Sequence, residues 1–202
     1  MSITFRFFSF FFDRFVSWPP AEVLSLKAMI DPPMAMLASR HLALVRAARG
    51  HERIEVDYVS LSRPDREGRI IVPHTLVWTG LRWHVRAWCE KNQDYRDFVL
   101  SRFRGEPELL GASSRTAAAD QDWQTQIEVL IGPDPRLNQN QQAVIAQDYG
   151  MVEGRWRLTV RAKLLPYLLK LLQLDTSHTL DDPKAQQIVI LNKAAVSSWL
   201  FD

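Results

Sequence analysis

The stretch that decides the fold runs from Pro73 to Cys89 and reads PHTLVWTGLRWHVRAWC. Its two apolar segments meet at Gly80, a pattern that predicts two strands joined by a turn. Side chains alternate between the faces of a strand. One face of the second segment therefore carries Arg82, His84, Arg86 and Trp88, and the other carries Trp83, Val85, Ala87 and Cys89. Because guanidinium groups bind oxyanions and stack on flat rings, the first face is interpreted as a surface that holds something flat and anionic.

Neighbouring segments extend this pattern along the first half of the chain. Short alternating runs predict strands, and a run with helical spacing that ends at Gly50 predicts an amphipathic helix. The strands are expected at residues 53–61, 69–79, 81–89 and 95–103, after a helix at 34–49. Several short strands so close together predict a small, strongly bent β-barrel. Residues 105–122 show no period and are expected to form a loop or linker.

The second half predicts a different architecture. Strands are expected at 126–131, 155–163 and 187–191, and helices at 138–148, with Asn138 as a possible cap, and at 166–174. This order indicates a two-layer α/β sandwich. The fold class is therefore α+β, with a helix and barrel at 34–105, an α/β domain at 120–202, and a connecting or dimer-contact segment at 1–33.

Composition places the 202-residue chain among ordinary globular proteins, with 47% hydrophobic and 24% charged residues and a net charge of +2. Arginines outnumber lysines by 19 to 6, which fits either anion binding or a GC-rich genome. The single cysteine, Cys89, excludes an internal disulfide and suits a reducing cytoplasm. The histidines have no metal-ligand spacing, so we expect no metal and no cofactor.

The first eighteen residues are rich in phenylalanine, interrupted by Arg6, Asp13 and Arg14. The segment is too short and too charged for a transmembrane helix and lacks a signal-peptide cleavage site. Two interpretations remain open: a packing or dimer-contact element, and a remnant of an upstream domain. Its apolar character favours a homodimer.

The spaced blocks of the chain resemble a WYL domain followed by its C-terminal extension. The blocks are Asp57–Ser60, Arg69–His74, Gly80–Ala87 and Tyr95–Arg102, then Pro135–Asn138, Gln141, Tyr149–Met151 and Arg161–Leu172. Trp83-His84-Val85 stands where the family has Trp-Tyr-Leu. The variant triplet, Pro73-His74 and Tyr149-Gly150-Met151 are most similar to the BrxR/CapW class of bacterial regulators associated with anti-phage defence.

This resemblance implies an Sm/SH3-like barrel that senses a nucleic acid or nucleotide. It also implies a homodimer that controls transcription through an N-terminal winged helix-turn-helix. The sequence departs from the family there, because the residues before the first barrel strand show no recognition-helix pattern. We therefore expect the DNA-reading domain to be absent.

The expected ligand site gathers basic and hydroxyl side chains at one mouth of the barrel. Its residues are Ser60, Arg69, His74, Arg82, His84, Arg86, Arg102 and Arg104. For single residues a structural role competes: Trp83 favours the core, and Arg96 and Asp97 fit a surface ion pair. No catalytic residues are expected, because no activated nucleophile or carboxylate pair stands out.

The sequence thus predicts a non-enzymatic, cytoplasmic, ligand-sensing module of a WYL-type transcription regulator that binds single-stranded nucleic acid or a nucleotide-like anion. The alternative is a protein–protein interaction module that dimerises with a full-length regulator and tunes it.

Overall fold

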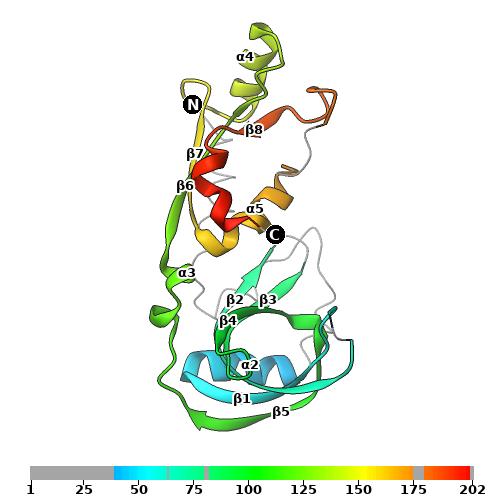
Figure 1. Ribbon diagram of the computed structural model, residues 1–202, viewed down its shortest axis with the longest axis vertical. Helices are drawn as coiled ribbons and strands as arrows, with labels where there is room; N and C mark the ends of the chain where they lie inside the picture. The colour runs from blue at the N-terminus through cyan, green and yellow to red at the C-terminus, as the bar shows by residue number, and fades with distance from the viewer. Residues whose placement is uncertain (1–38, 63, 80–81, 175–179, 201–202) are drawn as a thin grey trace. The chain divides into compact units, whose positions relative to one another are not determined.

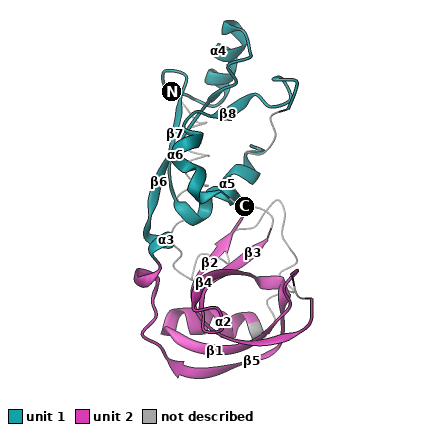
Figure 2. Ribbon diagram, in the orientation of Figure 1, with its two compact units in different colours: residues 1–16, 121–202 teal, residues 17–120 magenta. Residues whose placement is uncertain are grey.

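The computed structural model describes residues 39–62, 64–79, 82–174 and 180–200, and the side chains from residue 41 onward. These residues form two compact units (Figures 1 and 2). The five-stranded unit ends at Asp120, and the three-stranded unit begins at Gln121. The fold class is α+β, as predicted, with one antiparallel sheet in each unit. The predictions for residues 1–38, including the dimer-contact segment and the start of the first helix, lie outside the described residues.

The first sheet is antiparallel, with strand order β4-β3-β2-β1-β5. Its strands are β1 (Glu52–Tyr58), β2 (Glu67–Trp78), β3 (Trp83–Cys89), β4 (Asp94–Val99) and β5 (Phe103–Ala112). The strands curl around helix α2 (Figure 1). The described strands β4 and β5 form the two edges and share no ladder, so a closed Sm/SH3-like barrel is not confirmed.

The inner face of the curled sheet forms the core of this unit. Ile54, Val56 and Tyr58 of β1 alternate inward and are at most 5% exposed. The predicted core face of β3 is confirmed, since Val85, Ala87 and Cys89 are fully buried. Helix α2 (Ser39–Gly50) packs on β1, β2 and β5, and its Leu44 and Ala47 complete the cluster. Trp83 is only partly buried against this core.

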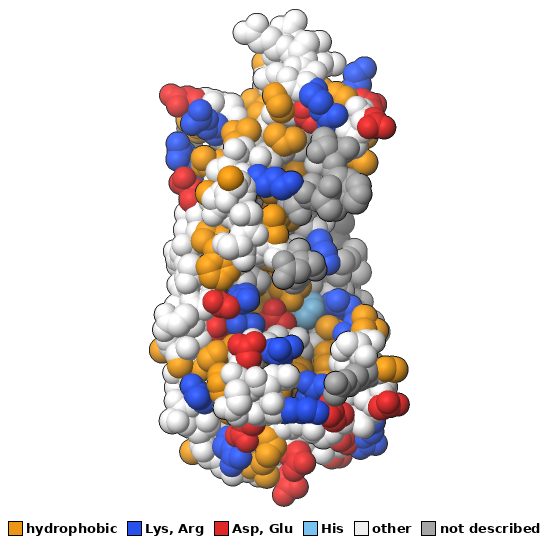
Figure 3. All heavy atoms as spheres, viewed as in Figure 1, with side chains coloured by type: hydrophobic (Ala, Val, Ile, Leu, Met, Phe, Trp, Pro, Cys, Tyr) orange, Lys and Arg blue, Asp and Glu red, His pale blue; other side chains and the backbone are white. Residues whose placement is uncertain are grey.

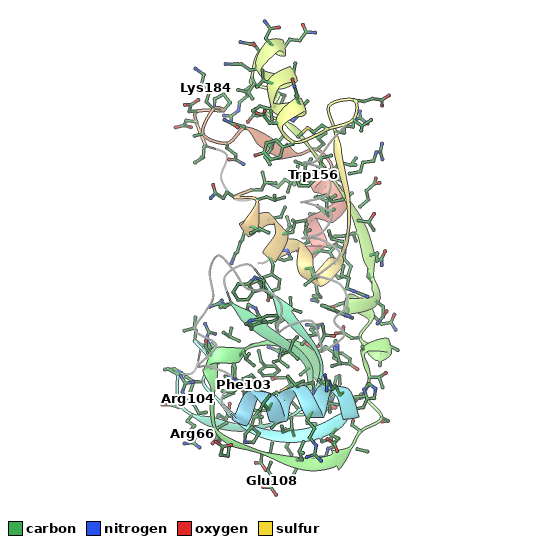
Figure 4. The ribbon with its side chains drawn as sticks, turned by 180° about the vertical axis from the view of Figure 1, so that it is seen from behind. Arg66, Phe103, Arg104, Glu108, Trp156 and Lys184 are labelled. Atoms are coloured by element: carbon green, nitrogen blue, oxygen red, sulfur yellow. The ribbon has the colours of Figure 1, made fainter. Side chains whose placement is uncertain are left out.

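One prediction was wrong in this unit. Part of the expected linker at 105–122 is strand β5, which pairs with β1 through two register shifts. Exposed glutamates alternate along β5, and Gly105 and Gly111 have positive φ. Such an edge strand buries little apolar surface on its outer side, so its sequence resembles a loop. Figure 4 labels the first two residues of β5, Phe103, which is 2% exposed, and Arg104, which is exposed.

The three-stranded unit has the predicted element order. Its strands β6 (Gln126–Pro133), β7 (Trp156–Arg161) and β8 (Ile188–Ile190) are ordered β7-β6-β8. Helices α4 (Gln139–Asp148) and α5 (Leu165–Leu171) lie between them in sequence, after the short α3 (Gln121–Gln124) and before α6 (Lys193–Val196). The predicted cap is confirmed: Asn138 and Gln141 form a reciprocal capping box at the start of α4.

Candidate ligand-binding pocket

A polar pocket of about 480 Å³ opens at one end of the five-stranded unit. Its volume lies within the range of small-molecule sites. Segments from four parts of the sheet line it: the end of β1 and the residues after it, β2, the β3–β4 turn with β4, and the turn before β5. The lining residues are Tyr58, Ser60, Leu61, Ser62, Arg69, Lys91, Asn92, Arg96, Asp97, Phe98 and Arg102.

The register of β1 and β2 explains why a charged side chain lines this pocket. Arg69 pairs with Val56, and Glu67 pairs with Tyr58. Partners across a ladder point to the same face, so Arg69 and Glu67 extend the inward face of β2 toward its open end. The Arg69 side chain is consequently only 13% exposed, and its guanidinium lies 5.7 Å from the centre of the Tyr58 ring.

The charge of the pocket is predominantly positive. Four cations line it, namely Arg69, Lys91, Arg96 and Arg102, against one lining carboxylate, Asp97. Side-chain hydroxyls at Ser60 and Ser62 lie 3.2 Å apart. The apolar part of the wall comes from the almost fully buried Tyr58 and Phe98, whose rings meet edge-on at 5.0 Å. Guanidinium and hydroxyl groups around one opening can bind a phosphate.

A second charged cluster lies inside the same unit. Asp120 accepts two hydrogen bonds from Arg86, at 2.7 Å from Nε and 3.0 Å from Nη2. Nε2 of His74 lies 3.2 Å from the same carboxylate, and the Arg86 Nη1 donates to Asp97 at 3.4 Å. The side chains of Arg86, Asp120 and His74 are at most 3% exposed. Burial disfavours the charged form of Arg86, but hydrogen bonding to Asp120 and the charge of Asp97 outweigh it and raise the pKa of Arg86.

A β-bulge brings His74 into this buried cluster. The β2–β3 register shifts between Pro73, which pairs with Ala87, and Thr75, which pairs with Arg86. His74 is therefore the extra residue of β2, and bulges re-aim side chains. Its Nδ1 lies 2.8 Å from the Thr75 hydroxyl while Nε2 faces Asp120. The Tyr95 ring packs beside the cluster, because its centre lies 5.6 Å from that of the His74 ring and 6.0 Å from the Arg86 guanidinium.

His84 is also buried, at 4% exposure. Desolvation lowers its pKa to about 4, and the charges of Arg82 and Arg102 add to that effect while Asp97 opposes it. Its imidazole is therefore neutral at pH 7, so it brings no positive charge to the site. Arg82 is exposed at the end of the β2–β3 hairpin, where its carbonyl accepts hydrogen bonds from the backbone and hydroxyl of Thr79.

The predicted site residues thus separate into three groups. Ser60, Arg69 and Arg102 line the pocket. The side chains of His74, His84 and Arg86 are buried, which differs from the expected open ligand face; Asp120 contacts two of them, His74 and Arg86. Arg82 and Arg104 are exposed outside the pocket, and Arg104 donates to the carbonyls of Ser101 and Phe103.

Sequence reasoning missed several lining residues. Lys91 and Asn92 fall between the strands expected at 81–89 and 95–103, and Arg96 and Asp97 fit a surface ion pair by sequence. Asp97 instead bonds Arg86, and Arg96 lies 3.8 Å from Asp94. A signal was present in the cross-strand partners, since Arg86 lies opposite Asp97 once β3 and β4 are paired. Figure 3 shows cationic and acidic side chains mixed over the lower, five-stranded unit.

No group of three or more His, Cys, Asp or Glu side chains among the described residues could hold a metal ion. No helix in the described part of the chain is long and apolar enough to cross a membrane.

Comparison with known protein families assigns a domain to each unit. Residues 40–105 match the WYL domain, and residues 126–196 match the C-terminal dimerization domain of the BrxR transcriptional regulator.

Three similar proteins are each described as DNA-binding transcriptional repressor CapW. The protein from Stenotrophomonas maltophilia is 32% identical over 188 residues, which are 93% of this chain and 62% of that protein. The protein from Escherichia coli (strain KTE188) is 35% identical over 191 residues, 94% of this chain and 62% of that one. A Pseudomonas aeruginosa protein is 36% identical over 157 residues, 78% and 52% respectively. The chain spans less than two thirds of the length of these relatives.

Among solved structures, proteasome accessory factor B/C (PafBC) of Arthrobacter aurescens aligns with 85% of this chain and 26% of its own, at 20% identity and a TM-score of 0.38. A CRISPR Cas-related protein aligns with 78% of this chain and 47% of its own, at 9% identity and a TM-score of 0.34.

Proposed function

We propose that this chain is the ligand-sensing module of a transcription regulator, because it is a WYL/BrxR/CapW-like protein. It combines a WYL domain with a BrxR-type C-terminal dimerization domain. Its ligand is a single-stranded nucleic acid or a nucleotide-like anion, and it works as a homodimer in the cytoplasm. The observation that supports this proposal is the cationic pocket with aromatic and hydroxyl groups at its wall.

The pocket chemistry favours a phosphate-bearing ligand over a purely apolar one. Arg102 and Arg69 approach from different segments, so two guanidinium groups can bind one oxyanion. Tyr58 and Phe98 add apolar contact at the pocket wall, although most of each ring is buried in the core. Arg86 supports the pocket wall by its contact with Asp97, and His74 contacts Asp120, the other carboxylate that Arg86 bonds.

Binding is tested by fluorescence anisotropy with a labelled short oligothymidylate, competed by unlabelled nucleotides. We expect affinity to fall as salt rises, because phosphate contacts release counterions. Arg102→Ala should weaken binding about tenfold or more, since a charge-assisted hydrogen bond contributes about 1.5–3 kcal/mol. Arg157→Ala is the matched control, because Arg157 is an exposed arginine of β7 in the other unit. Equal losses in the two variants, or no binding at low salt, would count against the proposal.

The second candidate is a dimerisation module that tunes a full-length regulator. The match of residues 126–196 to a dimerization domain favours it and is compatible with ligand sensing. Light scattering across micromolar concentrations should give the mass of a dimer. A salt-tolerant dimer that binds neither oligonucleotides nor nucleotides would favour this candidate alone. A monomer would count against the dimerisation module and against the homodimer proposed for the ligand sensor.

A further inference from the structure

Glu67 bridges two of the four cations that line the pocket. Its Oε2 lies 3.0 Å from Nη2 of Arg69, and its Oε1 accepts a hydrogen bond from Nζ of Lys91. The hydrogen bond from Lys91 holds the pKa of the Glu67 carboxyl below its usual range, together with the charges of Lys91 and Arg69. A single carboxylate therefore bridges Arg69 on β2 and Lys91 after β3, and its one negative charge offsets only part of their combined positive charge.

Arg69 nevertheless keeps a donor that the protein does not use. Among the described residues, its Nε is buried and has no hydrogen-bond acceptor. Its Nη1 makes only a long contact, 3.4 Å, with Oδ1 of Asn92. A buried guanidinium with an unsatisfied donor loses the hydrogen bond that water would give it. An incoming oxyanion can supply that acceptor if it competes with Glu67 for the same guanidinium.

We propose that Glu67 is a built-in competitor that makes the pocket selective for ligands ending in a phosphate monoester, such as a 5′-phosphorylated nucleotide or oligonucleotide end. This inference rests on the proposed function. A phosphodiester carries one negative charge, as the Glu67 carboxylate does, so exchanging one for the other gains little. A phosphate monoester carries about −1.5 to −2 charges at pH 7 and three acceptor oxygens. It can satisfy Arg69 and Lys91 more fully than the carboxylate it displaces.

The experiment compares two labelled oligothymidylates of equal length, one with a 5′-phosphate and one without, by anisotropy at fixed salt. In the wild-type protein the phosphorylated probe should bind about tenfold more tightly, the effect of one additional charge-assisted contact. Glu67→Gln removes the competing charge and should raise the affinity for the unphosphorylated probe several-fold. The difference in affinity between the two probes should therefore become smaller. Glu108→Gln is the matched control, because Glu108 is exposed on β5 of the same unit (Figure 4) and should leave both affinities unchanged.

The outcomes separate this inference from the function on which it rests. If neither wild type nor Glu67→Gln binds either probe, both the nucleotide-binding function and the competitor role fail. The competitor role is overturned, while nucleotide binding stands, if the wild type binds both probes equally. It is also overturned if Glu67→Gln prefers the phosphorylated probe as strongly as Glu108→Gln does. The wild-type comparison needs no variant, and Glu67→Ser serves as a second variant should Glu67→Gln not fold.

Discussion

The open pocket and the buried cluster use the same residue types on the same curled sheet, yet their surroundings give them different roles. In the pocket, Arg102 and Arg69 face an opening with one lining carboxylate. In the cluster, Arg86 is bound on both sides by Asp120 and Asp97, at 3% exposure. An arginine whose donors are already satisfied stabilises the fold, whereas one with unsatisfied donors near solvent can bind a ligand.

Asp97 belongs to both regions. It lines the pocket with its side chain 23% exposed, and its Oδ1 accepts a hydrogen bond from Arg86. The cluster thereby fixes one wall of the pocket, so a change in the buried ion pair is expected to alter the pocket as well. Substitutions in each region in turn test whether their arginines have different roles.

The largest effect is expected for Arg86→Ala. Removing one partner of a buried ion pair leaves the Asp120 carboxylate without its guanidinium, which costs about 3–5 kcal/mol of unfolding free energy. Urea unfolding monitored by circular dichroism measures the loss. Replacing Arg86 by Met and Asp120 by Leu together should cost less than Arg86→Ala alone, because no charge is then left buried. Arg102→Ala is the pocket control and should stay within about 0.5 kcal/mol of the wild type. If Arg86→Ala were as stable as Arg102→Ala, the arginine of the buried cluster would contribute no more to folding than the arginine of the pocket.

Acidification is the next largest effect. The folded-state pKa of His84 is lowered to about 4, while the unfolded state keeps a value near the model-peptide 6.5. Between these values the unfolded state binds more protons, so stability is full above pH 6.5 and falls as the pH drops toward 4. The contribution is on the order of 3 kcal/mol. His84→Asn should flatten the dependence of unfolding free energy on pH in this window. An identical pH slope in the variant and the wild type would show that His84 is not the titrating group.

A smaller effect is expected for Tyr58→Phe, a change at the base of the pocket. The Tyr58 hydroxyl accepts a hydrogen bond from the Val99 backbone N–H at 3.0 Å in a buried position. Its loss leaves that N–H unsatisfied and should cost about 1–3 kcal/mol. Thermal unfolding measures the change, and ligand titration shows whether the pocket depends on it. No change in melting temperature would indicate that water replaces the hydroxyl.

The smallest effect is expected for Arg66→Ala. Arg66 bonds Asp57 with its side chain 60% exposed, and exposed pairs contribute about 0.2–1 kcal/mol. Neither stability nor ligand affinity should change beyond that range in denaturant unfolding and anisotropy. A loss as large as that of Arg86→Ala would mean that exposure does not separate structural from ligand-binding arginines in this unit.

The sequence predicted the elements whose pattern is local. The alternation of Val85, Ala87 and Cys89 identified the inner face of β3, and Asn138 identified the start of α4. These features depend on side chains within a few residues of one another, so a single chain segment contains the information. Strand β5 was missed because an edge strand that exposes its glutamates lacks that local pattern.

The separation of the basic residues was decided only by the tertiary structure. Arg86 and Arg102 look alike in sequence, and the difference between them comes from Asp120, which lies far from Arg86 along the chain but bonds it in the fold. Likewise, the bulge at His74 and the pairing of Glu67 with Lys91 arise from register between strands. Residue type and spacing by themselves determined a basic, strand-rich domain; which arginine meets a carboxylate and which meets solvent depends on long-range packing, because burial decides whether a charge needs an internal partner.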